Sequence, residues 1–192
     1  MLKSILLSAL LAFAAFGAAA QSGKQDDGGA GSGILYGPDY SFVVKAPKGW
    51  VLDNTSAKSQ GIDAVFYPEG SSWRESEAVM YVGIGRKMGE KDTLEGVISR
   101  DLADFKKAAP GIKIVDSQAL TLAHGKEKVV VKYFVEAERA THEAVAYIEE
   151  SKVVVMLVLN SKSKERFESS LPALKELAAS YYFLSDSPTI QK

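Results

Sequence analysis

The side chains best suited to catalysis are few, because the chain contains two histidines and no cysteine. His124 lies in "LAHGKEK", which predicts a hairpin turn, and His142 lies in "ERATHEAV", near the start of a predicted strand. A Ser–His–acid site requires a histidine beside its nucleophile. Serines are common here, but no G-x-S-x-G elbow is present. We therefore expect no enzyme activity and no cofactor, and a hydrolase would need an unrecognised site.

The second candidate chemistry is metal binding. His142 and Glu143 could act with Glu136 and Glu138 as ligands. The sequence contains no H-E-x-x-H, no HxH and no regularly spaced carboxylate loop. Acidic residues at the end of a strand are usually a solvated face, so we expect no dedicated metal site; weak divalent binding stays open.

A glycine-rich segment, "GIGRKMG" from Gly83 to Gly89, precedes a predicted helix and resembles a phosphate loop. Its spacing does not match G-x-G-x-x-G. Asp92 and Glu95 would also occupy the positive end of the helix that should face a phosphate. These glycines are better interpreted as a bulge or a close packing contact within a strand.

The segment "EGSSWRESE" suggests a protein-binding loop. Trp73 and Arg74 are residue types that often anchor interfaces, and they stand in a polar stretch expected to be exposed. We therefore assign them as candidate partner-binding residues. The alternative is that Trp73 folds back and caps its own sheet.

The N-terminus predicts export. Lys3 precedes an apolar run over 5–20 that ends in three alanines, the pattern of a cleaved secretory signal peptide covering residues 1–20. The run is short and alanine-rich for a membrane anchor, which is the alternative. No cysteine follows it, which excludes a lipidated N-terminus. We expect a periplasmic or secreted protein.

Composition restricts the mature protein further. Without Lys3 it would carry 22 Lys and Arg against 24 Asp and Glu, a balance that argues against a nucleic-acid partner. No other segment is apolar and long enough to span a membrane. Without cysteine no disulfide can form, so stability must come from a packed core.

The chain divides into a linker, one domain and a tail. Residues 21–33 are rich in Gly, Ser and Asp and predict a flexible linker. The domain is expected over 34–185, and residues 186–192 form a polar tail.

Within the domain, residue periodicity predicts four strands, a helix, four strands and a second helix. Strands are expected over 40–47, 49–53, 62–68, 78–87, 112–122, 129–138, 143–150 and 153–160, and the closing helix falls within 161–183. Asp92 is the expected N-cap of the first helix. Val153 to Leu159 is apolar throughout, which indicates a central strand covered on both faces. Consecutive strands joined by short turns indicate an antiparallel sheet packed against helices, an α+β domain.

The stretch "KAPKGWVLD" places Pro47 and Gly49 directly before Trp50. The two breakers predict a turn between strands, and Trp50 then opens the second strand. We interpret Trp50 as a core anchor rather than a binding residue.

These elements also resemble a known family. An exported chain with "YSFVVKAPKGW", an extended "AVFYPEG" and the closing "AYIEESKVVVMLVLNSKSKERFESSLPALKELAASYYF" is similar to the PsbP-like family over Tyr40 to Phe183. That family includes the extrinsic PsbP proteins of photosystems and bacterial periplasmic proteins of unknown role. The resemblance implies an antiparallel sheet between helical layers, an α/β/α sandwich.

It also implies a non-catalytic accessory role exerted by binding other proteins. We therefore expect an envelope protein as the partner. The alternative is a carrier of a small apolar ligand or lipid. No photosynthetic feature is identifiable, so only the accessory role is carried over.

Overall fold

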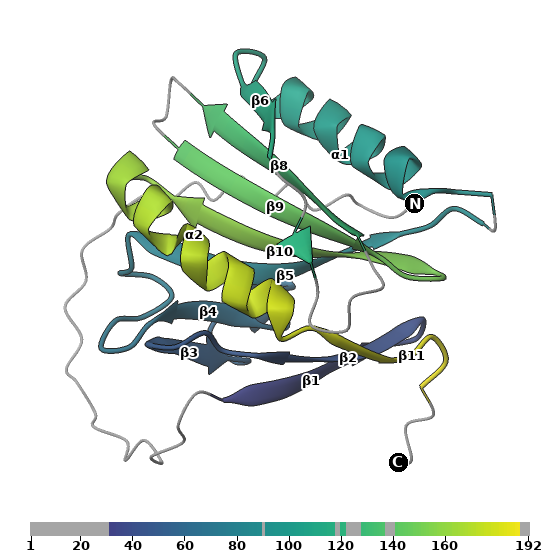
Figure 1. The fold of residues 1–192 in the computed structure, drawn as a ribbon, viewed down its shortest axis with the longest axis horizontal. Helices are drawn as coiled ribbons and strands as arrows, with labels where there is room; N and C mark the ends of the chain where they lie inside the picture. The colour runs from purple at the N-terminus through teal and green to yellow at the C-terminus, as the bar shows by residue number, and fades with distance from the viewer. Residues whose placement is uncertain (1–30, 90, 118–119, 122–127, 137–140, 189–192) are drawn as a thin grey trace.

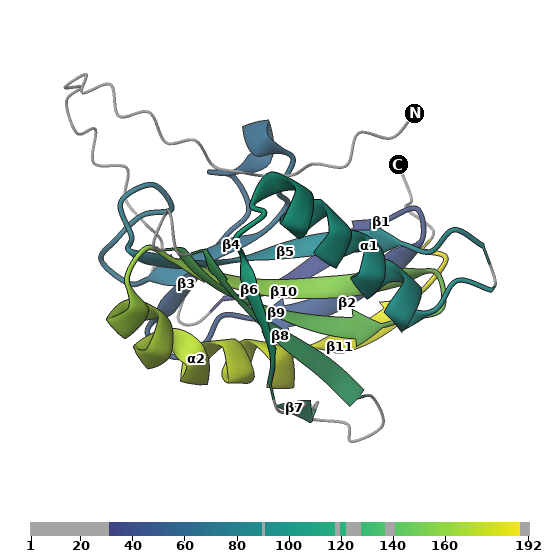
Figure 2. The same ribbon diagram turned by 90° about the horizontal axis from the view of Figure 1, so that it is seen from above.

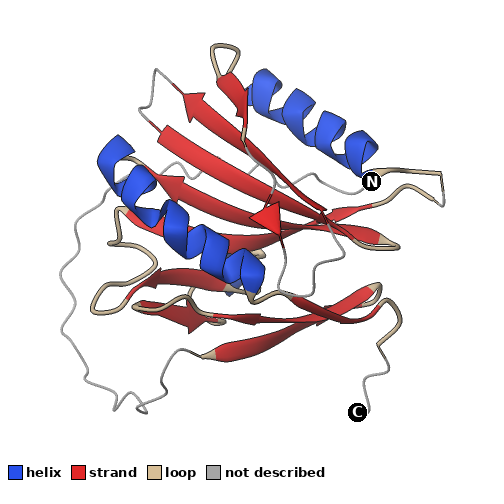
Figure 3. Ribbon diagram, in the orientation of Figure 1, coloured by secondary structure: helices blue, strands red, loops and turns tan. Residues whose placement is uncertain are grey.

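A computed structural model describes residues 31–89, 91–117, 120–121, 128–136 and 141–188 (Figures 1 and 3). The helices are α1 (Leu94–Ala108), α2 (Lys164–Ala179) and the short 3-10 helix η1 (Lys58–Gln60). The strands are β1 (Ser32–Gly37), β2 (Tyr40–Lys45), β3 (Trp50–Asp53), β4 (Val65–Pro68), β5 (Ala78–Arg86), β6 (Lys113–Asp116), β7 (Leu120–Thr121), β8 (Lys128–Glu136), β9 (Thr141–Glu149), β10 (Val153–Ser161) and β11 (Tyr182–Ser185).

The strands form a large and a small antiparallel sheet. The large sheet has the order β3-β4-β5-β10-β9-β8-β6, with β7 beside β8. The β10 strand lies in its middle, and from Val153 to Leu159 every side chain except the half-buried Met156 is buried. The prediction of a central, doubly covered strand is therefore confirmed.

Helices cover opposite faces of the large sheet (Figure 2). The α1 helix packs through Leu94, Val97 and Ile98 on one face. The α2 helix packs on the other face, where the small sheet, of order β1-β2-β11, closes the same core. The predicted α+β fold, an antiparallel sheet between helices, is confirmed, with the small sheet as an additional part of one layer.

Two strands differ from the sequence-based expectation. The β1 strand begins at Ser32, two residues before the expected start of the domain, because it pairs along its length with β2. The β11 strand lies where the closing helix was expected to continue. The α2 helix instead ends at Ala179, Tyr181 is buried just beyond it, and the next residues pair with β2.

The cap of α1 also differs. Thr93, not Asp92, is the N-cap, and its hydroxyl accepts a hydrogen bond from the Gly96 amide at 3.3 Å. Asp92 accepts one from the Met88 amide at 2.7 Å and pairs with Arg100 at 2.5 Å. The acidic side chain thus fixes the preceding loop and the second turn of the helix.

The turn before Trp50 joins the small sheet to the large one. The Trp50 amide bonds the Pro47 carbonyl at 3.0 Å, and Gly49 adopts a φ of 76°, which favours glycine. The Lys48 amide donates to the Glu176 carboxylate on α2 at 3.0 Å. The turn therefore delivers Trp50, 8% exposed, into the core.

Gly85 allows α1 to approach the sheet. A Cβ at this position would lie 2.7 Å from Cγ1 of Val97 on α1. The interpretation of this glycine as a close packing contact, rather than part of a phosphate loop, is confirmed.

Candidate protein-interaction site

The loop between β4 and β5 carries Trp73 and Arg74. It leaves β4 through Gly70, whose φ is 80°. The Ser76 amide then bonds the Ser72 carbonyl at 3.0 Å, and the Glu75 amide bonds the Ser72 hydroxyl at 3.3 Å. These local bonds give the loop a defined shape at the position of Trp73 and Arg74.

Trp73 is half-buried against its own domain. Its ring lies 6.2 Å from that of Tyr81, edge to face at 83°, and it packs on a small cluster built around Ile62 and Val65. Arg74 beside it is exposed and makes no ion pair or hydrogen bond with the described residues. Trp73 therefore folds back onto its own domain, as in the alternative interpretation of this loop. Arg74 projects from the surface beside the packed Trp73 ring.

Tyr67 and Asp53 form a further part of the structure that supports Trp73 and Arg74. The Tyr67 hydroxyl donates to Asp53 at 3.0 Å, and Asp53 also accepts from the amides of Thr55 and Ser56 at 2.7 and 3.0 Å. Burial alone would raise the pKa of Asp53, but the hydrogen bonds from Ser56 and Thr55 outweigh it and hold that pKa far below its usual range. Asp53 is therefore a fixed anion that organises the β3–β4 connection.

A buried group of polar side chains lies on the face of the large sheet that α1 covers, the face to which Tyr81 also belongs. Glu143 on β9 is 9% exposed and accepts a hydrogen bond from the Asn160 amide at 2.8 Å. Burial, with a smaller contribution from Asp101, raises the pKa of Glu143 to about 7. The Tyr147 hydroxyl donates to Asp101 on α1 at 2.5 Å, and burial raises the pKa of Asp101 as well.

These buried polar side chains lie near Tyr81, the aromatic residue that contacts Trp73. Burial raises the pKa of Tyr81, followed by the charges of Glu143 and Asp101. Tyr81 therefore contacts Trp73 and also lies within electrostatic range of the two carboxyl groups. These carboxyl and hydroxyl groups are therefore hydrogen-bonded near the aromatic ring of Tyr81. They provide no activated nucleophile of the kind that acyl transfer needs.

The expected solvated acidic face is wrong for Glu143, which is buried. His142 and Glu143 are neighbours on one strand, so their side chains point to opposite faces. His142 contacts Phe167 of α2, with ring centroids 5.6 Å apart, and cannot share a metal with Glu143. Within the described residues no group of three acidic or histidine side chains could hold a metal ion. His124, Glu138 and the Glu136 side chain lie outside what the structure describes.

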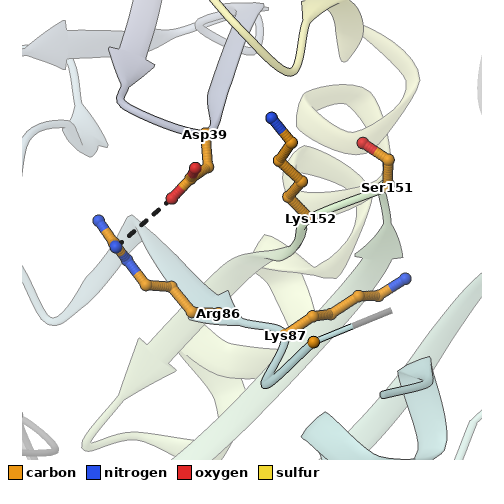
Figure 4. A pocket seen from close by; sticks show the side chains of 6 residues that line it. Asp39, Arg86, Lys87, Ser151 and Lys152 are labelled. Carbon is orange, nitrogen blue, oxygen red and sulfur yellow. Dashed lines mark ion pairs between the residues drawn. The ribbon is translucent and has the colours of Figure 1, made fainter. Parts of the chain in front are cut away.

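A cavity of about 290 Å³ lies where the β1–β2 and β9–β10 turns meet the end of β5 (Figure 4). Its cations are already partnered. Arg86 lies 3.4 Å from Asp39, Lys87 bonds Glu149 at 2.6 Å, and Lys152 bonds the Asp186 carbonyl at 3.0 Å. The end of the glycine-rich segment thus contributes one ion pair, Arg86–Asp39, that links the two sheets and one, Lys87–Glu149, within the large sheet.

A second cavity, of about 440 Å³, lies beside the turn that precedes Trp50. It is lined by that turn and by Glu69, Glu176 and Ser180.

No described helix has the length and apolar character needed to cross a bilayer.

The two layers of helix and the mainly antiparallel sheet define a class of fold found in solved structures. The solution structure of cyanobacterial PsbP (CyanoP) from Synechocystis sp. PCC 6803 is similar, with 16% identity and a TM-score of 0.51, covering 85% of this chain and 98% of that chain. The Saccharomyces cerevisiae Ran-binding protein Mog1p is also similar, with 13% identity and a TM-score of 0.50, covering 81% and 96%.

The protein therefore has a PsbP-like fold, and the resemblance seen in the sequence is confirmed at the level of the fold. No protein-family model matches the chain, and no curated protein matches it.

The sequence did not indicate that Tyr81 contacts Trp73, or that Asn160 donates a hydrogen bond to a buried Glu143. One signal was available for Glu143. In "HEAVAYI" it stands in phase with Val145 and Tyr147, which face α1. A glutamate in phase with buried residues of an inner strand indicates a buried carboxyl group.

Proposed function

We propose that this protein is an exported, non-enzymatic accessory domain that binds an envelope protein through the β4–β5 loop. The observation that carries the proposal is Arg74, whose exposed guanidinium has no ion-pair or hydrogen-bond partner among the residues that the structure describes and stands beside a half-buried tryptophan. Tryptophan and arginine contribute much of the binding energy in many interfaces. A supported aromatic base also reduces the entropy lost when a loop binds.

The fold agrees with such a role. One of the similar structures is described as a Ran-binding protein, so this architecture is used elsewhere to bind a protein. Polar and charged residues make up most of the lining of the cavity at the end of β5, which differs from the apolar pocket that a lipid carrier would need.

Charge reversal at Arg74 should weaken partner capture. Arg74→Glu should reduce the amount of the partner retained from the protein's own envelope at least tenfold, because it replaces the donor of the contact by a repelling charge. Its urea midpoint should equal that of the wild type, because the side chain is exposed.

Lys175→Glu is the matched control, because Lys175 is an exposed cation on α2 and the net charge changes equally. Capture by this control should stay at the wild-type level. If both variants lose partner capture equally, net charge alone explains the loss. If neither variant loses capture, the β4–β5 loop does not contact the partner.

Export predicts a defined N-terminus. The mature chain should begin at Gln21, since Ala18 to Ala20 form a signal-peptidase site. Intact mass of the protein accumulated in cells measures this directly. A product that retains residues 1–20 would contradict the export step, and Ala18→Leu should block cleavage if the site is right.

A further inference from the structure

The β1 strand is an unusually open sheet edge. Exposed edges in natural proteins are normally short, charged or irregular, since a free edge pairs with other strands. The β3 and β6 edges have four residues each and end in Asp53 and Asp116. The β11 edge also has four residues, and its register is irregular next to Leu184.

In contrast, β1 has six residues, SGILYG, with neither charge nor proline, and among the described strands it pairs with β2 alone (Figure 1). Ile34 and Tyr36 on this strand are 64% and 56% exposed. Another exposed side chain, that of Tyr182 on β11, stands on the same outer face of the small sheet, because Ile34 pairs with Val43 and Val43 with Tyr182.

We propose that β1 pairs antiparallel with β1 of a second copy of this chain. In this pairing a two-fold axis passes at Leu35, so Ile34 of each copy lies opposite Tyr36 of the other. Gly33 then stands opposite Gly37. This register keeps each outward side chain opposite an outward one, as antiparallel pairing requires.

A second copy fits this edge for two reasons. Every residue of the strand is uncharged, so pairing two copies of it places no like charges opposite one another. The aromatic–β-branched pair formed by Ile34 and Tyr36 is among the favourable cross-strand pairs. One six-residue pairing gives a small interface, so the dimer should dissociate on the order of micromolar concentration or above.

The absence of cysteine from the chain makes the pairing testable by disulfide formation. We would prepare Ile34→Cys and Tyr36→Cys in the form the cell accumulates and oxidise each alone and both mixed. Directly opposite residues of an antiparallel pair have Cα atoms about 4.5–5.5 Å apart, within the roughly 4.4–6.8 Å that a disulfide spans. The mixture should give covalent dimer several-fold above either variant alone, and Val115→Cys, exposed on the β6 edge, should give little.

The uncrosslinked protein gives an independent readout. Sedimentation should show a concentration-dependent dimer for the wild type and for Val115→Lys, and monomer for Tyr36→Lys with an unchanged urea midpoint. A wild type that stays monomeric with no crosslinks overturns the proposal. Ile34→Cys dimers without a mixed product, or crosslinks only to another protein, also overturn it. None of these residues belongs to the β4–β5 loop, so failure here is distinguishable from failure of the proposed function.

Discussion

Trp50→Ala is expected to lower the free energy of unfolding by about 3–5 kcal/mol, the usual cost of truncating a buried aromatic side chain. Trp50 is 8% exposed, belongs to the main core and pairs with Pro68 at the start of the large sheet. Its loss would leave a cavity where the two sheets join. The turn cannot readily collapse into that cavity, because its Lys48 amide is bonded to Glu176 of α2.

Urea unfolding of the two proteins measures this change, with Trp73→Ala as the matched control. Trp73 is half-buried, so its truncation should cost only about 1–2 kcal/mol, near the centre of the range for point mutations. A loss below about 1 kcal/mol for Trp50→Ala would contradict its assignment as a core anchor.

Glu143→Gln is expected to stabilise the protein above pH 7 by about 3 kcal/mol. Burial raises the pKa of Glu143 from an ordinary 4.5 to about 7, and one pKa unit corresponds to about 1.4 kcal/mol. The folded protein holds the proton that the unfolded chain releases. That contribution is complete below about pH 4.5 and is lost as the pH rises through about 7.

Glutamine is neutral at every pH and can still accept the hydrogen bond from Asn160. The variant and the wild type should therefore be about equally stable at pH 4 and diverge towards pH 8. Asp101, whose pKa is also raised, stays in both proteins, so the difference isolates Glu143. Glu69→Gln, at an exposed carboxylate, should follow the wild type at all pH values. Parallel curves for Glu143→Gln and the wild type would contradict the buried, proton-holding state.

The elements with long periodic patterns could be predicted from the sequence, and the short ones could not. The central strand from Val153 to Leu159 and the α1 stripe follow directly from apolar spacing. The β11 strand could not be found this way, because "YYFLS" continues the apolar pattern of α2. Its strand conformation depends on pairing with β2, more than 130 residues earlier. The β1 strand, rich in glycine, is likewise defined by its partner.

The candidate site was predictable only as residue types. Trp73 and Arg74 stand out in a polar loop, but the position of Tyr81 under Trp73 depends on the pairing of β4 with β5. Glu143 lies near Tyr81 because β9, β10 and β5 are neighbours in the sheet, which local sequence does not encode. Residues brought together by sheet order are therefore the part of the site that only the structure provides.

The most direct test of a docking role is photo-crosslinking in living cells from a single benzophenone amino acid placed at position 71, an exposed site in the β4–β5 loop that leaves Arg74 in place. The same probe at position 175 on α2 serves as the control. We predict one discrete protein adduct from position 71, absent from position 175 and reduced by Trp73→Ala in the same chain. Identical adduct patterns from both positions, or none from position 71 while a small molecule copurifies with the protein, would contradict this docking role.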